Sequence, residues 1–161
     1  MEIFRNARPT DEDICFEIET SAYEADEAAT LEKISKRFEV FPDGFLVLEI
    51  EGRVVGFINC GCADKVEMSN EEFKELVGHD PDAPNVVIMS VVIDPSHQGK
   101  GLSRKLIEEF VERMRRMGKA TIHLMCKEHH VPLYEKFGYR YLRPLSSDHV
   151  GMTWHEMSNS L

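Results

Sequence analysis

The chain has 161 residues, 42% of them hydrophobic, and a formal net charge of −10. This length and composition suffice for one globular domain with its own core, which we expect to span residues 1–161. The acidic balance argues against nucleic acid as a partner, because such binding depends on Lys and Arg contacts to phosphate, and it mildly favours cationic substrates.

The sequence gives no sign of a membrane span or a metal site. Apolar runs stay below the ~20 residues that a span requires, so we expect no membrane partner and a cytoplasmic protein, either monomeric or homodimeric. The four cysteines lack the density of a disulfide framework, and the histidines show no i, i+4 pair with a supporting acid. We therefore assign no metal.

The first half of the chain alternates between strand and helix patterns. In chain order we predict a strand over Glu2–Asn6, helices over Asp11–Tyr23 and Thr30–Phe38, and strands over Phe45–Glu51 and Arg53–Cys62. Thr10 is the predicted cap of the first helix, and Glu51-Gly52 a tight hairpin turn. Ser69 with Glu72 forms a capping-box pattern that predicts a further short helix, before a polar connection over Gly78–Pro84.

The second half begins with a continuous apolar run that is typical of a strand buried on both faces. Val86–Ile93 forms this run, and Asp94-Pro95 ends it. Apolar residues then recur at helical spacing from Leu102 to Met117, so this helix packs one stripe on a core. We predict the remaining elements as strands over Ala120–Cys126, Tyr139–Leu145 and Val150–Met157, and a short helix over Val131–Phe137.

A glycine-rich loop joins the apolar strand to the long helix and resembles an anion cradle. Gly99 and Gly101 carry no Cβ, so an anion can approach the backbone, and the following helix N-terminus favours negative charge. A Walker loop would need Lys-Ser or Lys-Thr after the last glycine, but Leu102 and Ser103 follow. A Rossmann loop would need a third glycine and an early place in the chain. From this segment alone, a diphosphate site and an ordinary strand–turn–helix corner both stay open.

Two segments together resemble the GNAT superfamily of N-acetyltransferases, which bind acetyl-CoA. Gln98–Ser103 resembles the family signature Gln/Arg-x-x-Gly-x-Gly/Ala, with Ser103 in place of the last small residue. Downstream, Leu133–Tyr139 resembles the family block Leu-Tyr-x-Lys-x-Gly-Phe. The resemblance implies an α/β fold with a mixed, mostly antiparallel sheet of about seven strands, flanked by helices. Its central strands, around Val91 and Leu124, would splay apart to admit the pantetheine arm.

The same resemblance assigns roles to individual residues. Acetyl-CoA would be bound by Val91, Val92, Ile93, Gln98, Gly99, Lys100, Gly101, Leu102, Ser103 and Arg104. Backbone N–H groups of the first three would polarise the thioester carbonyl. Tyr134 would protonate the departing coenzyme A thiolate.

The segments FEIETSAY, GFLVLEIEGRVVGFI, LMCKEHHVPLYEKFGY and GMTWHEM are similar to the serotonin N-acetyltransferase branch in its non-vertebrate form. This likeness implies an arylalkylamine such as serotonin, tryptamine or phenethylamine as acceptor. The vertebrate enzymes carry two relay histidines where Val87 and Met89 stand here. Without them, we expect activity to climb steadily toward alkaline pH, because alkylamines are mostly ammonium near pH 7.

The general base is the least determined part of this assignment. Carboxylates of the first helix and the loop after it are the candidates, namely Glu17, Glu19, Glu24, Asp26 and Glu27. Glu19 is the first choice, and a water chain through backbone carbonyls is the alternative. Residues that could form an aryl pocket are Phe16, Tyr23, Phe38, Phe41 and Trp154.

Two other functions are compatible with the sequence. The first is a GNAT acetyltransferase that acts on polyamines, peptide N-termini or lysine side chains. The second is a non-catalytic sensor that binds acyl-CoA, which the missing relay histidines would permit but the presence of Tyr134 disfavours. Release of free thiol from acetyl-CoA distinguishes an enzyme from a sensor.

Overall fold

The structure, a computed structural model, describes residues 1–23, 28–68, 76, 78–146 and 153–161. A seven-stranded sheet in the order β1-β2-β3-β4-β5-β7-β6 forms its centre. The strands are β1 (Glu2–Asn6), β2 (Phe45–Ile50), β3 (Arg53–Ala63), β4 (Asn85–Ile93), β5 (Thr121–Lys127), β6 (Arg140–Ser146) and β7 (Thr153–Ser160). Neighbouring strands are antiparallel except β4 and β5, which are parallel. The sheet is therefore mixed and mostly antiparallel, as expected.

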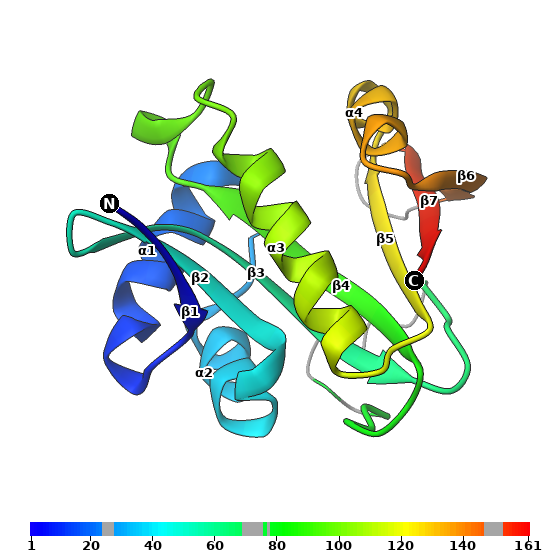
Figure 1. Cartoon of the computed structure of the whole chain (residues 1–161), viewed down its shortest axis with the longest axis horizontal. Helices are drawn as coiled ribbons and strands as arrows, with labels where there is room; N and C mark the ends of the chain where they lie inside the picture. The colour runs from blue at the N-terminus through cyan, green and yellow to red at the C-terminus, as the bar shows by residue number, and fades with distance from the viewer. Residues whose placement is uncertain (24–27, 69–75, 77, 147–152) are drawn as a thin grey trace.

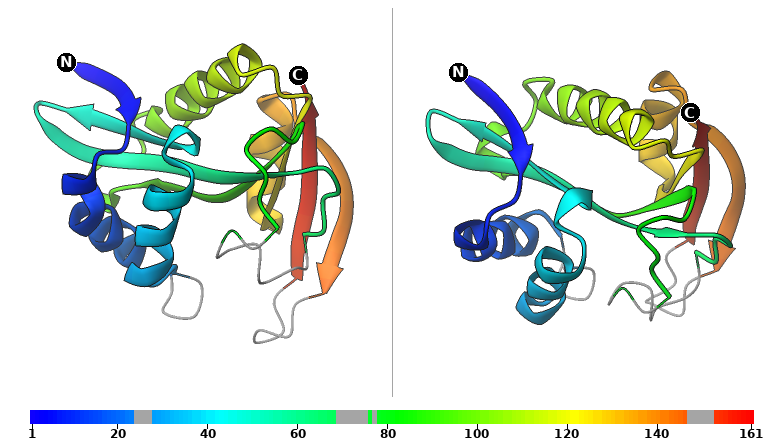
Figure 2. Two further views of the ribbon diagram at one scale, coloured as in Figure 1. Left: turned by 90° about the horizontal axis from the view of Figure 1, so that it is seen from below. Right: turned by 60° about the horizontal axis from the view of Figure 1, so that its bottom comes forward.

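Helices cover the two faces of the sheet unequally. α1 (Glu12–Ala22) and α2 (Leu31–Val40) lie on one face of the N-terminal strands, and α3 (Leu102–Arg116) lies on the other (Figures 1 and 2). The apolar stripe of α3 is buried as predicted, with Leu106 and Phe110 inaccessible to solvent. The short helix α4 (Val131–Lys136) follows β5 on the α3 side. Among the described residues, no helix packs on the face of β5, β6 and β7 that lies opposite α3 (Figure 2).

The parallel strands β4 and β5 separate soon after they meet. They pair at only three positions, from Asn85 opposite Thr121 to Val87 opposite His123. Beyond these pairs the two strands diverge, as Figure 1 shows. The sequence-based expectation that the strands splay around Val91 and Leu124 is confirmed.

β4 contains a β-bulge just after its last pair with β5. Asn59 of β3 lies opposite Ser90, but the next residue, Cys60, lies opposite Ile88, so Met89 is an extra residue. A bulge bends its strand and redirects the side chains on either side of it. Here Ser90 contacts α2 through Arg37.

Several element boundaries differ from the predictions. Thr10 does not cap α1, because Pro9–Asp11 forms a 3-10 turn in front of the helix. Asp11 occupies the N-cap position, and its carboxylate accepts the Arg8 N–H at 2.7 Å. β6 begins at Arg140, one residue late, because the Tyr139 N–H bonds back to the Tyr134 carbonyl at 3.0 Å.

Other predictions lie partly outside the described residues. The helix expected from Ser69 and the beginning of the strand expected from Val150 belong to this group. The described part of that strand continues to Ser160 rather than ending at Met157. None of the described helices is both long and apolar enough to cross a bilayer. Among these residues, no three His, Cys, Asp or Glu side chains gather in a way that could hold a metal ion.

Candidate active site

The loop between β4 and α3 is held in place by its own side chains. The Asp94 carboxylate accepts the Ser96 N–H at 3.1 Å and so starts the 3-10 turn over Pro95–His97. The Gln98 side-chain amide donates to the Ile93 carbonyl at 3.1 Å, which ties the loop to the end of β4. The loop therefore has a defined shape without any ligand.

The two glycines of this loop adopt backbone conformations that favour glycine. Gly99 has φ of 79° and Gly101 has φ of 75°, both in the left-handed region. A Cβ built at either position would meet no protein atom within 4 Å. The space in front of the backbone is therefore open, and Gly101 stands directly before the first turn of α3. Backbone N–H groups at such a helix start have no partner inside the helix and suit an anion.

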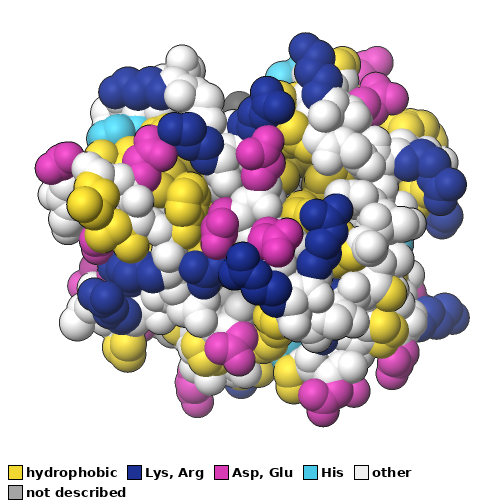
Figure 3. Space-filling model, viewed as in Figure 1, with side chains coloured by type: hydrophobic (Ala, Val, Ile, Leu, Met, Phe, Trp, Pro, Cys, Tyr) yellow, Lys and Arg dark blue, Asp and Glu magenta, His cyan; other side chains and the backbone are white. Residues whose placement is uncertain are grey.

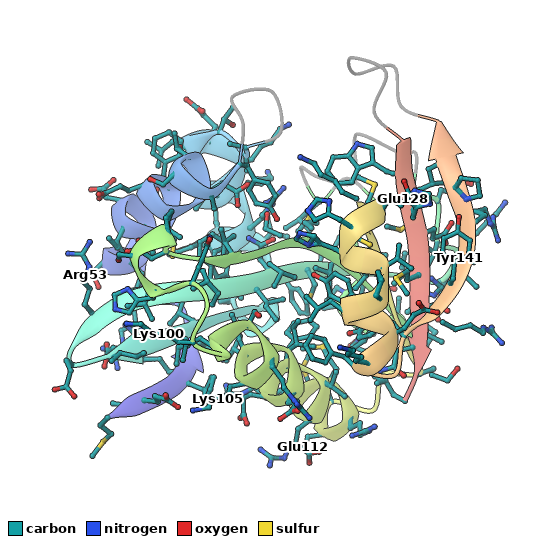
Figure 4. The ribbon with its side chains drawn as sticks, turned by 90° about the horizontal axis from the view of Figure 1, so that it is seen from above. Arg53, Lys100, Lys105, Glu112, Glu128 and Tyr141 are labelled. Atoms are coloured by element: carbon teal, nitrogen blue, oxygen red, sulfur yellow. The ribbon has the colours of Figure 1, made fainter. Side chains whose placement is uncertain are left out.

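Basic side chains near the loop differ in their availability. Lys100 is exposed and forms no ion pair with another described residue (Figure 4). In contrast, Arg104 pairs with Glu108 at 2.9 Å, and Lys105 pairs with Glu2 of β1 at 3.0 Å. Figure 3 shows basic and acidic side chains interleaved over the α3 face. Lys100 is thus the basic residue with the least local competition for an anionic ligand.

The backbone of β4 faces the splay at alternate residues. The Asp94 N–H donates to the Val55 carbonyl of β3 at 2.7 Å. Because backbone groups in an antiparallel ladder point to the two sides alternately, Val92 also faces β3, whereas Val91 and Ile93 face the splay. Of the three expected residues, Val91 and Ile93 thus offer backbone groups to the splay. The Val92 side chain packs on the α1 and α2 side.

Tyr134 lies beside the splay on the α4 side. The residue is 8% exposed, and its ring makes edge contacts with Tyr139 and Phe137, with centroids 5.7 Å and 6.2 Å away. Burial raises the pKa of Tyr134 above its usual value, and the nearby Tyr23 and Cys126 add to this shift. Tyr134 is therefore protonated throughout the neutral range, with neighbours on both sides of the splay.

Tyr23 approaches the splay from the opposite side. It follows the last residue of α1, and its N–H donates to the Glu19 carbonyl at 3.0 Å. Its hydroxyl donates to the Val91 carbonyl at 3.2 Å. Tyr23 was expected only as a possible member of an aryl pocket, yet it binds the backbone that faces the splay.

Glu19 belongs to a buried polar cluster on the α1 and α2 face of the sheet. Its side chain is 1% exposed, and one carboxylate oxygen accepts the Ala29 N–H at 2.8 Å. The neighbouring Arg37 guanidinium donates to Asn59 and Ser90, each at 3.4 Å. Burial raises the pKa of Glu19, and the Ala29 N–H, Ser90 and Arg37 oppose that shift. This cluster therefore anchors both helices to β3 and to the bulge of β4.

The remaining carboxylates considered for the base divide into two groups. Glu17 is exposed on α1. Glu24, Asp26 and Glu27 lie outside the described residues. At the positions of the absent relay histidines, Val87 is buried against Ala63, and Met89 is half-buried.

Sequence reasoning overlooked one pair of polar residues, His123 of β5 and Glu156 of β7. His123 Nδ1 lies 3.8 Å from a Glu156 carboxylate oxygen. The sequence signal was the alternation of polar with apolar residues at the start of β5, where His123 stands between Ile122 and Leu124. It becomes informative only when β5 and β7 are known to be neighbours.

Known proteins resemble the chain over part or all of its length. It is 34% identical over 89 residues to a glucosamine 6-phosphate N-acetyltransferase of Trypanosoma brucei brucei, covering 55% of this chain and 52% of that protein. The chain spans about half the length, or less, of the curated relatives it matches: the matched segments cover 39% of one relative and 52% of the other.

Solved structures share the fold at low sequence identity. The loading GNATL domain of CurA from Lyngbya majuscula superposes with a TM-score of 0.88 at 17% identity, covering 99% of this chain and 98% of that one. The structure of yncA from Salmonella typhimurium with its cofactor acetyl-CoA has a TM-score of 0.72 at 22% identity, and the superposition covers 100% of this chain and 94% of that one. The model of the acetyltransferase (GNAT) family matches residues 11–139. This match covers the β4 loop, α3 and Tyr134, so the chain belongs to the acetyltransferase (GNAT) family.

Proposed function

We propose that this chain is an N-acetyltransferase that transfers the acetyl group of acetyl-CoA to a primary amine. The observation that carries the proposal is the open glycine loop, which lies at the start of α3 and at the mouth of the splay between β4 and β5. Membership of the GNAT family supports the reaction, as does the name of the glucosamine 6-phosphate relative. The acetyl-CoA in the yncA structure supports the donor.

The residues present fit a coenzyme A diphosphate and its pantetheine arm. We assign the diphosphate to the segment Gln98–Arg104, where open backbone N–H groups and the exposed Lys100 supply donors and positive charge. Val91 and Ile93 would offer backbone groups to the amides of the arm, while Val92 supports the strand from behind. Acetyl-CoA supplies the thioester carbonyl and the leaving thiolate.

Tyr134 is the proposed acid for that thiolate. A thiol such as free Cys has a pKa of about 8.5, and burial holds the pKa of Tyr134 well above that value. The hydroxyl is thus always protonated when the thiolate forms, and hydrogen-bond donation is easier for it than complete proton release. The role that fits is stabilisation of the thiolate by the Tyr134 O–H, followed by proton transfer.

We propose Glu19 as the general base, and its two carboxylate oxygens differ in their surroundings. One oxygen is held by the Ala29 N–H, and the other is buried without a hydrogen bond to a described residue. The raised pKa of Glu19 suits a group that takes up a proton. Because the carboxylate is sealed under the sheet, the proton would have to reach it through a neighbour such as Ser90.

For the acceptor we propose a small arylalkylamine, on the strength of the resemblance to the serotonin N-acetyltransferase branch. The test is a panel of tryptamine, phenethylamine, spermidine, a lysine peptide, a peptide with a free N-terminus and glucosamine 6-phosphate, each with acetyl-CoA. Thiol release with kcat/KM highest for an arylalkylamine is the expected result. A higher kcat/KM for another member would move the acceptor to that class. Acetyl-CoA binding without thiol release for every member would indicate a sensor.

A further inference from the structure

The bulge of β4 changes the face on which the side chains of this strand lie. Before the bulge, Val87 packs with Ala63 on the face opposite α3. Residues two apart in a regular strand share a face, so a regular β4 would place Met89 beside Val87. Met89 instead packs against the core cluster under α3. The extra residue accounts for the difference, because a bulge redirects the side chains next to it.

Met89 lies where the splay closes. The ladder between β4 and β5 ends at Val87, and Ile88 is buried in the core. Met89 is the next residue and is only half-buried. Val91 follows two residues later, roughly 7 Å along an extended strand, and is half-buried on the same face. A ligand arm that runs along β4 from the glycine loop therefore passes Val91 first and meets Met89 last.

Apolar side chains that are only partly buried flank the splay on its α4 side as well. Val131 and Phe137 are half-buried and pack against the same cluster as Met89 and Val91. The Phe137 ring also contacts the ring of Tyr134, with centroids 6.2 Å apart. We call Met89, Val91, Val131 and Phe137 the apolar lining. Because apolar surface gains free energy when it leaves water, this lining suits an uncharged alkyl group better than a polar one.

Protein fills the space beyond Met89. Val86 of β4 and Ile122 of β5 are partners in the ladder, and neither is accessible to solvent. Both belong to the core cluster under α3. Interiors of this kind are close-packed and leave few voids. An alkyl chain that reaches this end of the splay can therefore grow longer only where the Met89 side chain gives way.

We propose that Met89 is the residue that determines acyl-chain specificity, and that its side chain limits the donor to acetyl- and propionyl-CoA. The inference rests on the proposed acetyltransferase function and concerns its donor rather than its acceptor. A methionine side chain is unbranched and adapts to irregular gaps. It can thus yield to one additional methylene, whereas a longer chain would have to displace the buried ladder behind it.

The test varies the size of residue 89 and the length of the acyl chain together. Met89→Ala enlarges the end of the apolar lining, and Met89→Phe fills it. Each variant and wild type are compared with acetyl-, propionyl-, butyryl- and hexanoyl-CoA. Thiol release with the amine of highest turnover gives kcat/KM. Isothermal titration calorimetry gives the affinity for each acyl-CoA without any amine, so it reports the fit of the acyl group independently of turnover.

The two variants should shift the preference in opposite directions. In wild type, kcat/KM should be similar for acetyl- and propionyl-CoA and at least about 10-fold lower for butyryl-CoA, as expected for a misplaced methylene. Met89→Ala should improve butyryl-CoA roughly 10-fold relative to acetyl-CoA, in kcat/KM and in affinity, because each newly buried methylene is worth about fourfold. Met89→Phe should lose propionyl-CoA before acetyl-CoA. A general loss of stability would not produce opposite shifts.

Met125→Ala is the matched control. Met125 lies on β5, across the splay, and is half-buried like Met89. Its neighbours Leu124 and Cys126 belong to the cluster under α3, so the Met125 side chain points to the opposite face. Met125→Ala removes the same kind of side chain as Met89→Ala. It should leave the order of preference among the four acyl-CoAs unchanged.

Three results would overturn the inference. Equal kcat/KM for acetyl- and hexanoyl-CoA in wild type would show that Met89 does not limit the chain. An equal relative loss with every acyl-CoA in Met89→Ala would reduce the residue to a structural role. A gain of longer chains in Met125→Ala but not in Met89→Ala would assign the limit to the other face. Chain-length selectivity in calorimetry without any thiol release would support the inference and overturn the proposed acetyl transfer instead.

Discussion

The glycine before α3 offers a sharp test of the cofactor site, because the same helix supplies a matched control. Gly101 precedes the helix and Gly118 follows it, with φ of 75° and 78°. At neither position would a Cβ meet a protein atom within 4 Å. Alanine at either site should therefore cost the same backbone strain, about 1–2 kcal/mol for a left-handed residue. In a protein of this size that corresponds to a fall in Tm of roughly 2–8 °C.

Only Gly101→Ala should also affect the cofactor. Its methyl group projects into the space assigned to the diphosphate, and the loss of one hydrogen bond to a charged group is worth about 1.5–3 kcal/mol. We therefore expect acetyl-CoA to bind roughly 10- to 100-fold more weakly to Gly101→Ala, and with unchanged affinity to Gly118→Ala. Gly101→Glu, which adds a like charge, should abolish binding.

Isothermal titration calorimetry with acetyl-CoA gives the affinities, and thermal unfolding gives the strain. Equal stability losses with a selective loss of affinity in Gly101→Ala would match the reasoning. An unchanged affinity for both alanine variants, or for Gly101→Glu, would refute the placement of the diphosphate at this loop.

Three further variants test other parts of the site. Tyr134→Phe should lower kcat by about 10²-fold while the affinity for acetyl-CoA is kept. The control variant Tyr139→Phe should have a kcat near that of wild type. A kcat of Tyr134→Phe within about twofold of wild type excludes the acid role. In the unliganded protein the Tyr23 hydroxyl occupies the Val91 carbonyl, so it competes with the cofactor for that group. Tyr23→Phe removes the competition, and calorimetry should show acetyl-CoA binding a few-fold tighter, by about 1 kcal/mol. Weaker binding to Tyr23→Phe would contradict this competition. The raised pKa of Glu19 stabilises the fold at low pH, and this contribution is lost as pH rises from the unfolded value through the folded one. Urea unfolding should therefore show Glu19→Gln gaining stability relative to wild type with rising pH, and a pH-independent difference would oppose a raised pKa.

Local features were predictable from the sequence because neighbouring residues determine them. The Glu51-Gly52 hairpin is one example, since both residues adopt positive φ, 50° and 78°, in the tight turn that their sequence favours. The start of α3 after Gly101 is another, because the apolar spacing and the glycine mark the same boundary. α2 begins at Leu31, one residue after the predicted start at Thr30, and Thr30 caps it by accepting the Lys33 N–H at 3.3 Å.

Features that depend on distant contacts were not predictable. Thr10 is a good cap in isolation, but Arg5 and the Arg8 N–H both bind Asp11, and this interaction favours the next residue as the cap. The extra residue at Met89 arises from the pairing of β4 with β3.

In the candidate site, too, some residues were predictable from local sequence and others were not. The glycine loop and Tyr134 carry local motifs, so the sequence could single them out. The polar surroundings of Glu19 and His123 bring together strands and helices far apart in the chain. Arg37, for example, meets Ser90 across 53 positions.

The three-residue ladder between β4 and β5 also has a mechanical consequence. It divides the sheet into one piece formed by β1 to β4 and another formed by β5 to β7, joined by few backbone hydrogen bonds and by side-chain packing. A ligand arm that lies between the two strands and bonds to β4 acts as a partial additional strand, wedged against β5. Its binding free energy then adds to the stability of the whole domain, and it stiffens the joint between the pieces. Amide hydrogens along the facing edges of these two strands should accordingly exchange faster in the unliganded protein than in the liganded one.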